Sequence, residues 1–175
     1  IEITGAGANR IPVAIADFGG EPGLSRALTS VIRADLERSG LFKLIDTSGV
    51  AMTENTAPGY GDWRNRGADA LAAGSLGAGG DGRLEARFRL YDINKQQPLA
   101  GVAYPTSSAT LRTAGHRIAD VIYEKLIGEP GVFSTRIAYV IKSGPARYEL
   151  TIADADGQNA QVALRSREPI ISPVW

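Results

Sequence analysis

Residues 11–45, IPVAIADFGGEPGLSRALTSVIRADLERSGLFKLI, contain the pattern that decides the fold. The mostly apolar residues 11–18 predict a short strand, which the glycines around Pro22 interrupt. From Leu24 onward the apolar residues recur at helical spacing, and Gly40 suits the left-handed position that ends a helix. Residues 41–45 predict a second strand. Because these elements are joined by short connections, we expect the two strands to be parallel.

The following residues extend this pattern into a larger domain. A loop is expected after the second strand, then a short helix, three further strands and a long helix, at residues 46–59, 63–66, 69–76, 83–92, 99–104 and 107–127. The strand at 83–92 alternates cleanly between apolar and polar residues, which is typical of a half-buried antiparallel strand. We therefore expect residues 1–130 to form an N-terminal α/β domain with a mixed five-stranded sheet and two main helices.

The pattern of predicted elements changes after Gly131. Three short strands are expected at similar spacing, at residues 136–142, 148–153 and 161–165, with turns between them. Three such strands need a neighbour to cover their apolar face, because a small isolated sheet cannot build its own core. Residues 131–175 are thus expected to be the beginning of a longer all-β structure.

Composition and charge exclude several classes of protein. The 175 residues include 19 Lys and Arg, 19 Asp and Glu, and no Cys. A net charge near zero disfavours a protein held mainly by nucleic acid or by anionic lipid. No apolar run is long enough to predict membrane insertion, and disulfides and thiolate metal sites are excluded. Because the chain opens at Ile1 without Met or a signal segment, it looks processed or cut.

His116 is the single histidine and would have to serve as the base of any serine hydrolase. It lies beside the apolar stripe of the second helix, and no serine stands in a nucleophile-elbow motif. The prediction is a histidine on the helix surface. We expect no catalytic, cofactor or metal site, and a hydrolase that uses His116 remains the enzymatic alternative.

Two glycine-containing motifs have a structural interpretation. Residues 5–10, GAGANR, resemble part of a dinucleotide-binding loop, but the third glycine and a following helix are missing. We expect a flexible joint there. Residues 154–157, DADG, lack the further ligands of a calcium loop and predict a β-turn.

The strand at 83–92 offers a second alternative function. Arg83, Arg87 and Arg89 share its polar face with Tyr91. A basic face with an aromatic ring could bind RNA, but the neutral net charge favours a solvated or covered face. No nucleic-acid partner is therefore expected.

The N-terminus, Ile1-Glu2-Ile3-Thr4, alternates apolar and polar residues ahead of Gly5 and Gly7. Free termini usually fray or dock on their own domain. An alternating segment on a glycine hinge could instead add as a strand to the sheet edge of a partner. The residues alone leave both interpretations open.

A family resemblance covers essentially the whole chain. The residues that carry it are 11–18, 34–46 (ADLERSGLFKLID), 62–74 (DWRNRGADALAAG), 111–140, 148–159 and 172–175 (SPVW). The most specific part runs from Thr113 to Val140, where AGH, YEKL and GVFSTRIAYV follow at fixed spacing. In these motifs the chain closely resembles the TolB family of the Tol–Pal envelope system.

The resemblance implies a fold and a function. It implies an α/β domain followed by a six-bladed β-propeller, of which residues 136–165 would be the first, incomplete blade and residues 169–175 a strand of the next. It implies a periplasmic, non-enzymatic adaptor of envelope integrity and cell division that links TolA to Pal. The TolA C-terminal domain would bind Ile1, Glu2, Ile3, Thr4 and Gly5, with Gly5 and Gly7 as the hinge of a flexible extension over residues 1–10. Pal would bind the propeller, which is mostly absent.

Overall fold

The computed structural model describes residues 10–80 and 83–171. The chain divides into two compact units, with the boundary between Gly131 and Val132. The first is called the α/β unit below, and the second is called the sheet unit. No helix in the described part of the chain is both long and apolar enough to cross a membrane.

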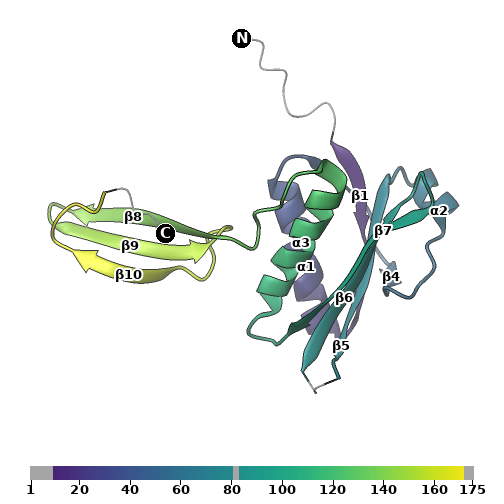
Figure 1. Cartoon of the computed structure of the whole chain (residues 1–175), viewed down its shortest axis with the longest axis horizontal. Coiled ribbons are helices and arrows are strands. Elements are labelled where there is room, and N and C mark those ends of the chain that lie inside the picture. The colour runs from purple at the N-terminus through teal and green to yellow at the C-terminus, as the bar shows by residue number, and fades with distance from the viewer. Residues whose placement is uncertain (1–9, 81–82, 172–175) are drawn as a thin grey trace, which may run out of the picture. The chain divides into compact units, whose positions relative to one another are not determined.

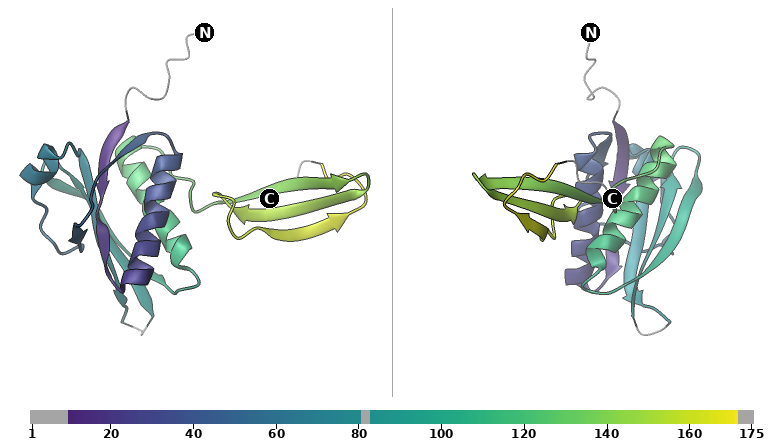
Figure 2. Two further views of the ribbon diagram at one scale, coloured as in Figure 1. Left: turned by 180° about the vertical axis from the view of Figure 1, so that it is seen from behind. Right: turned by 60° about the vertical axis from the view of Figure 1, so that its left-hand side comes forward.

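The α/β unit is a mixed sheet with two long helices packed on one face (Figures 1 and 2). The parallel strands have the order β3-β1-β5-β2-β4, and β6 and β7 continue antiparallel from the other edge of β5. The expected parallel pairing of the first two predicted strands is confirmed. In chain order the elements are β1 (Ile11–Ile15), β2 (Asp17–Gly20), α1 (Pro22–Arg38), β3 (Phe42–Ile45), β4 (Ala51–Met52), α2 (Tyr60–Asn65), β5 (Ala70–Ala78), β6 (Leu84–Asp92), β7 (Gln97–Thr106) and α3 (Leu111–Ile127).

The sheet has seven strands rather than the five expected. The predicted strand at residues 11–18 is split at Ala16, and its halves β1 and β2 follow one another along the same edge of β5. Ile15 pairs with Ala72 of β5, and Gly19 pairs with Ser75. The segment that joins β1 to β2 therefore has one residue more than the part of β5 opposite it, so the pairing register shifts there. The seventh strand, β4, pairs with β2 inside the segment expected to be a loop.

The break between β1 and β2 is held by a side chain from α1. The Arg33 guanidinium donates hydrogen bonds to the Ile15 carbonyl at 2.5 Å, the Asp17 carboxylate at 2.9 Å and the Thr47 hydroxyl at 2.7 Å. The Thr47 hydroxyl also donates to the Ile15 carbonyl. These bonds satisfy polar groups that the interrupted ladder leaves unpaired.

The helix ends follow local chemistry. The carboxylate of Glu21 accepts hydrogen bonds from the backbone N–H groups of Gly23 and Leu24, which caps α1. Helix α3 starts at Leu111, later than the expected residue 107, because Ser107 and Thr110 form a hydrogen-bonded turn ahead of it. Gly128 ends α3 with a positive φ of 90°.

The core of the α/β unit lies between the sheet and the two long helices. Its fully buried side chains include Leu36 of α1, Phe88 of β6 and Ile122 of α3. Helices α1 and α3 approach closely at Gly115, where a Cβ atom would lie 2.9 Å from Val31 Cγ1. A second cluster, around Trp63 and Tyr91, lies where α2 packs on the sheet.

The sheet unit is an antiparallel meander of β8 (Arg136–Gly144), β9 (Arg147–Asp154) and β10 (Gln161–Ser166), in the order β10-β9-β8. Four of its large apolar side chains are exposed, with Ile137, Ile141, Val162 and Leu164 at 41%, 42%, 40% and 51%, while others, such as Leu150 and Ile152, are partly buried. The strand expected at residues 169–175 lies partly outside the described residues, and residues 169–171 belong to no strand.

Candidate functional site

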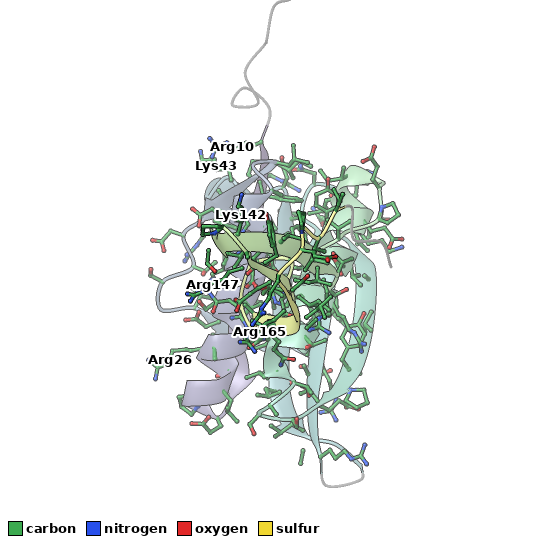
Figure 3. All side chains as sticks on the ribbon, turned by 90° about the vertical axis from the view of Figure 1, so that its left-hand side faces the viewer. Arg10, Arg26, Lys43, Lys142, Arg147 and Arg165 are labelled. Carbon is green, nitrogen blue, oxygen red and sulfur yellow. The ribbon has the colours of Figure 1, made fainter. Side chains whose placement is uncertain are left out.

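The expected binding segment lies outside the described residues, but the point where it joins the domain lies within them. Ile1 to Thr4, Gly5 and Gly7 all precede Arg10, the first described residue, which is exposed. The Ile11 N–H donates to the Leu41 carbonyl at 2.9 Å as the chain enters the sheet. Arg10 and Lys43 are labelled at this end of the α/β unit in Figure 3. Any segment ahead of residue 10 therefore leaves from the amino-terminal ends of β1 and β3.

This attachment point is held by strand pairing and by core packing. Strand β1 is paired on both sides, with Ile11 opposite Phe42 in β3 and Val13 opposite Ala70 in β5. The ring of Phe42 is buried and meets the ring of Tyr123 edge-on, with centroids 6.1 Å apart. Hydrogen bonds and core packing therefore both hold β1 in the sheet.

His116 is buried, so the expectation of a histidine on the helix surface is wrong. Its Nδ1 lies 2.5 Å from the Asp35 Oδ2 of α1, and both side chains are almost fully enclosed. The other carboxylate oxygen of Asp35 accepts from Arg38 at 3.0 Å. This pair ties α1 to α3. The available sequence signal was Asp35 itself, a carboxylate within the apolar stripe of α1.

Ser75 and Ser25 each have a hydrogen bond with a residue other than this histidine. The Ser75 hydroxyl donates to the Glu54 carboxylate at 2.6 Å. Ser25 is buried, and its carbonyl accepts a hydrogen bond from the Thr29 hydroxyl. Asp35, the acidic partner of His116, links α1 to α3. This geometry gives the hydrolase alternative no support.

The polar face of β6 is not a stacking surface. Arg87 pairs with Glu85 at 2.5 Å, so part of the basic charge is neutralised. Tyr91 is buried rather than exposed, with its ring edge-on to Tyr60. Single-stranded RNA needs exposed aromatic rings on which bases can stack, and Tyr91 does not provide one.

The DADG segment forms the expected β-turn. Gly157 has a φ of 82°, and its N–H donates to the Asp154 carbonyl at 2.8 Å. The Asp154 carboxylate accepts from the Asn159 amide, and the Asp156 carboxylate accepts from the Gln158 N–H. These carboxylates stabilise the turn and its flank.

Shifted pKa values in the α/β unit have local structural causes. The backbone N–H groups of Gly23 and Leu24 lower the pKa of Glu21, and hydrogen bonds from Ser48 lower the pKa of Asp46. Burial raises the pKa of Tyr104. Perturbed pKa values can mark catalytic sites, but a helix cap and a turn explain the two carboxylates.

An α/β domain followed by a three-stranded antiparallel meander defines a two-part protein. Residues 1–99 match the family model of the TolB amino-terminal domain, and residues 123–175 match that of the TolB beta propeller domain. The chain therefore belongs to the TolB family.

Relatives and a solved structure agree with this assignment. The chain is 63% identical to the Tol-Pal system protein TolB of Dechloromonas aromatica (strain RCB), and 55% identical to that of Bordetella pertussis (strain Tohama I). These alignments cover all of this chain but only 41% and 40% of those proteins. The crystal structure of TolB from Acinetobacter baumannii superposes with a TM-score of 0.83 at 35% identity, covering 99% of this chain and 43% of that one. The chain thus spans about two fifths of the length of its relatives.

Proposed function

We propose that the chain is part of a non-enzymatic periplasmic adaptor of the Tol–Pal envelope system. Its N-terminal segment binds the C-terminal domain of TolA, and the propeller that begins in the sheet unit binds Pal. The observation that carries this proposal is the match of both parts of the chain to TolB domain models. It is supported by relatives that are named Tol-Pal system proteins.

The N-terminal segment is suited to strand addition. Ile1 and Ile3 alternate with Glu2 and Thr4, so one face of an extended segment would be apolar. In strand addition the backbone supplies most of the affinity, and alternate side chains fill pockets on the partner. The paired strand β1 gives this segment a firm attachment, and we propose Gly5 and Gly7 as its hinge.

The sheet unit is suited to assembly with further chain. The side chains of Ile141 and Leu164 are about half exposed. An isolated sheet of three strands therefore gains little stability from the burial of apolar surface. Further blades would cover this apolar surface, in keeping with relatives that are more than twice as long. Pal binding is assigned to that larger propeller.

Removal of residues 1–9 tests the TolA contact. We expect affinity for the TolA C-terminal domain, measured by isothermal titration calorimetry, to fall by about tenfold or more, a change of about 1.4 kcal/mol. The described fold starts with β1 at Ile11, so the thermal unfolding curve should stay the same. Unchanged affinity in a folded truncated chain would refute the role of the segment.

A single substitution separates backbone pairing from side-chain contact. Ile3→Pro removes one backbone N–H and fixes φ, so it should weaken TolA binding nearly as much as the deletion. Ile3→Val keeps both the N–H and an apolar side chain and serves as the matched control. Equal affinities for the two variants would show that strand pairing is not the mode of binding.

A further inference from the structure

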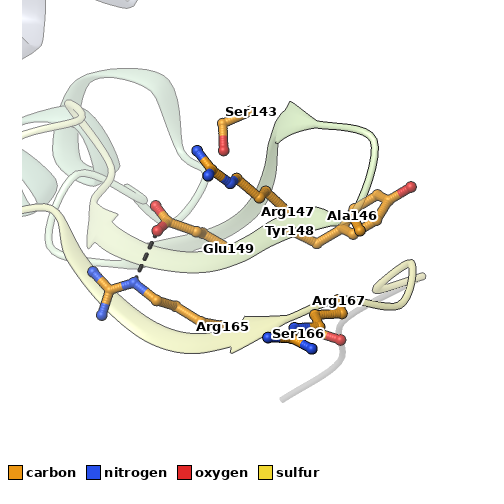
Figure 4. A pocket seen from close by; sticks show the side chains of 8 residues that line it. All are labelled: Ser143, Ala146, Arg147, Tyr148, Glu149, Arg165, Ser166 and Arg167. Atoms are coloured by element: carbon orange, nitrogen blue, oxygen red, sulfur yellow. Dashed lines mark hydrogen bonds and ion pairs between the residues drawn. The ribbon is translucent and has the colours of Figure 1, made fainter.

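A pocket of about 540 Å³ lies at one end of the sheet unit (Figure 4). The antiparallel register builds it, because Gly144 faces Arg147 across the β8–β9 turn, while Arg165 and Ser166 of β10 face Glu149 and Tyr148 of β9. The residues that line it are Ser143, Ala146, Arg147, Tyr148, Glu149, Arg165, Ser166 and Arg167.

The lining is strongly basic. It holds three guanidinium groups and one carboxylate, and the Arg165 Nε lies 2.9 Å from Glu149 Oε1. Arg147 and Arg167 are exposed, and no carboxylate within residues 10–80 or 83–171 forms an ion pair with either. The Lys142 ammonium lies close by, 5.6 Å from the centroid of the Tyr148 ring. The pocket therefore has unneutralised positive charge in a chain whose net charge is zero.

The backbone that carries the three arginines is constrained by a tight turn and by an ion pair between strands. Strands β8 and β9 are joined by a two-residue turn at Pro145 and Ala146, and the ring of Pro145 fixes one of its dihedral angles. The ion pair between Arg165 and Glu149 links β10 to β9, while Arg147 and Arg167 are exposed. A binding site that is already in position loses less entropy when a ligand binds.

The chemistry of the lining favours carboxylates of a protein as ligands. A guanidinium group presents a planar fork that matches a carboxylate with two parallel hydrogen bonds. Ser143 and Ser166 add hydroxyl donors at the rim. Nucleic acid and anionic membranes are bound through many phosphate contacts over a wide basic field, which a chain with a net charge of zero does not favour.

We propose that this pocket, centred on Arg147, Arg165 and Arg167, binds an acidic segment of a partner protein through its carboxylate groups. The site goes beyond the proposed TolA contact, which uses residues 1–5, and it does not depend on that contact. It adds a second, electrostatic recognition surface at the end of the meander.

A labelled hexa-aspartate peptide with blocked ends tests the proposal. Its binding to the 175-residue chain is measured by fluorescence anisotropy at low salt, with a hexa-asparagine peptide for comparison. We expect saturable binding of the acidic peptide only. Absence of saturation below about 1 mM, or equal binding of the asparagine peptide, would overturn the proposal.

Paired variants locate the site. The double variant Arg147→Gln with Arg167→Gln should weaken binding by about tenfold or more, because both outward guanidinium groups are lost. The double variant Arg26→Gln with Arg136→Gln removes the same charge from exposed residues outside the pocket and should change affinity by less than about threefold. Equal losses in both double variants would show attraction without a site and would overturn the proposal.

Two further probes separate the other classes of ligand. Arg147→Lys keeps the charge but loses the planar fork, so an intermediate affinity supports carboxylate recognition by guanidinium geometry. A single-stranded oligonucleotide and vesicles rich in phosphatidylglycerol should bind more weakly than the acidic peptide. Tighter binding of either, with a steep dependence on salt, would overturn the proposal in favour of phosphate.

Discussion

The two units of the chain differ in where their apolar residues lie. In the α/β unit, Leu36, Phe88 and Ile122 are enclosed between a sheet and two helices. In the described part of the sheet unit, Ala153 is the buried apolar residue, while Val162 and Leu164 are about half exposed. Both units contain well-formed strands, so regular hydrogen bonding alone does not separate them. The difference shows that one unit closes its own core and the other offers a surface for more structure to cover.

The largest expected effect is the loss of stability when a fully buried side chain of the α/β unit is truncated. Leu36→Ala should lower the free energy of unfolding by about 2–5 kcal/mol, because the fully buried side chain leaves a cavity between α1 and the sheet. The same cost is expected for Ile122→Ala in α3. Leu164→Ala, which truncates the same side chain where it is 51% exposed, should cost less than about 1 kcal/mol. Urea unfolding monitored by circular dichroism measures all three, and equal costs at Leu36 and Leu164 would contradict the contrast.

The pair between the long helices gives the next effect. Asp35→Asn keeps the shape of the side chain but removes the charge that faces His116 and Arg38. The free energy of unfolding should fall by about 1–3 kcal/mol at neutral pH, since a charged hydrogen-bond acceptor is lost in a buried place. Glu37→Gln on the exposed side of α1 is the control and should change stability by less than about 0.5 kcal/mol. If both substitutions have the same small effect, the pair is not a link between α1 and α3.

The close packing of α1 against α3 gives a further test of how tightly the core of the α/β unit is packed. Gly115→Ala would place a Cβ atom 2.9 Å from Val31 Cγ1, so the Val31 side chain or the helices must shift. Overpacking costs about 1–3 kcal/mol, and the better helix propensity of alanine returns about 1 kcal/mol, so the net loss should be about 1 kcal/mol. Gly101→Ala in β7 meets its nearest atom at 3.5 Å and should be close to neutral. A net gain in stability at Gly115, measured by thermal unfolding, would show that the helices can part at no cost.

The strand-helix-strand core of the fold was predictable because its signals are local. The apolar run at 11–18, the helical spacing after Leu24 and Gly40 each act within a few residues, and the parallel pairing followed from them. The break at Ala16 was not predictable, because it depends on the Arg33 guanidinium from another element. Sequence order gives no sign of such a contact.

Sites were harder to predict for the same reason. The partner of His116 lies 81 positions away in the chain, so its burial could be seen only once α1 and α3 were packed together. Arg147, Arg165 and Arg167 come together only through the register of β9 and β10, which brings Arg165 opposite Glu149. The residues of the N-terminal segment left two interpretations open, the family resemblance implied the contact with TolA, and that contact remains a prediction.

The smallest expected effect concerns the cap at the start of helix α1. The sheet unit offers no such test, since its residues 132–171 form strands and turns without a helix. Backbone N–H groups at the start of α1 lower the pKa of Glu21 below its ordinary value of 4.5. A carboxyl whose pKa is lowered in the folded state stabilises that state above its unfolded pKa, and this contribution is lost as the pH falls through the folded pKa. Glu21→Gln should therefore have a lower melting temperature than the native chain at neutral pH, and the difference should shrink as the pH falls below 4.5. Glu21→Asp keeps a capping carboxylate and should follow the native chain. A difference that stays constant down to acidic pH would show that the charge of Glu21 does not contribute to the start of α1.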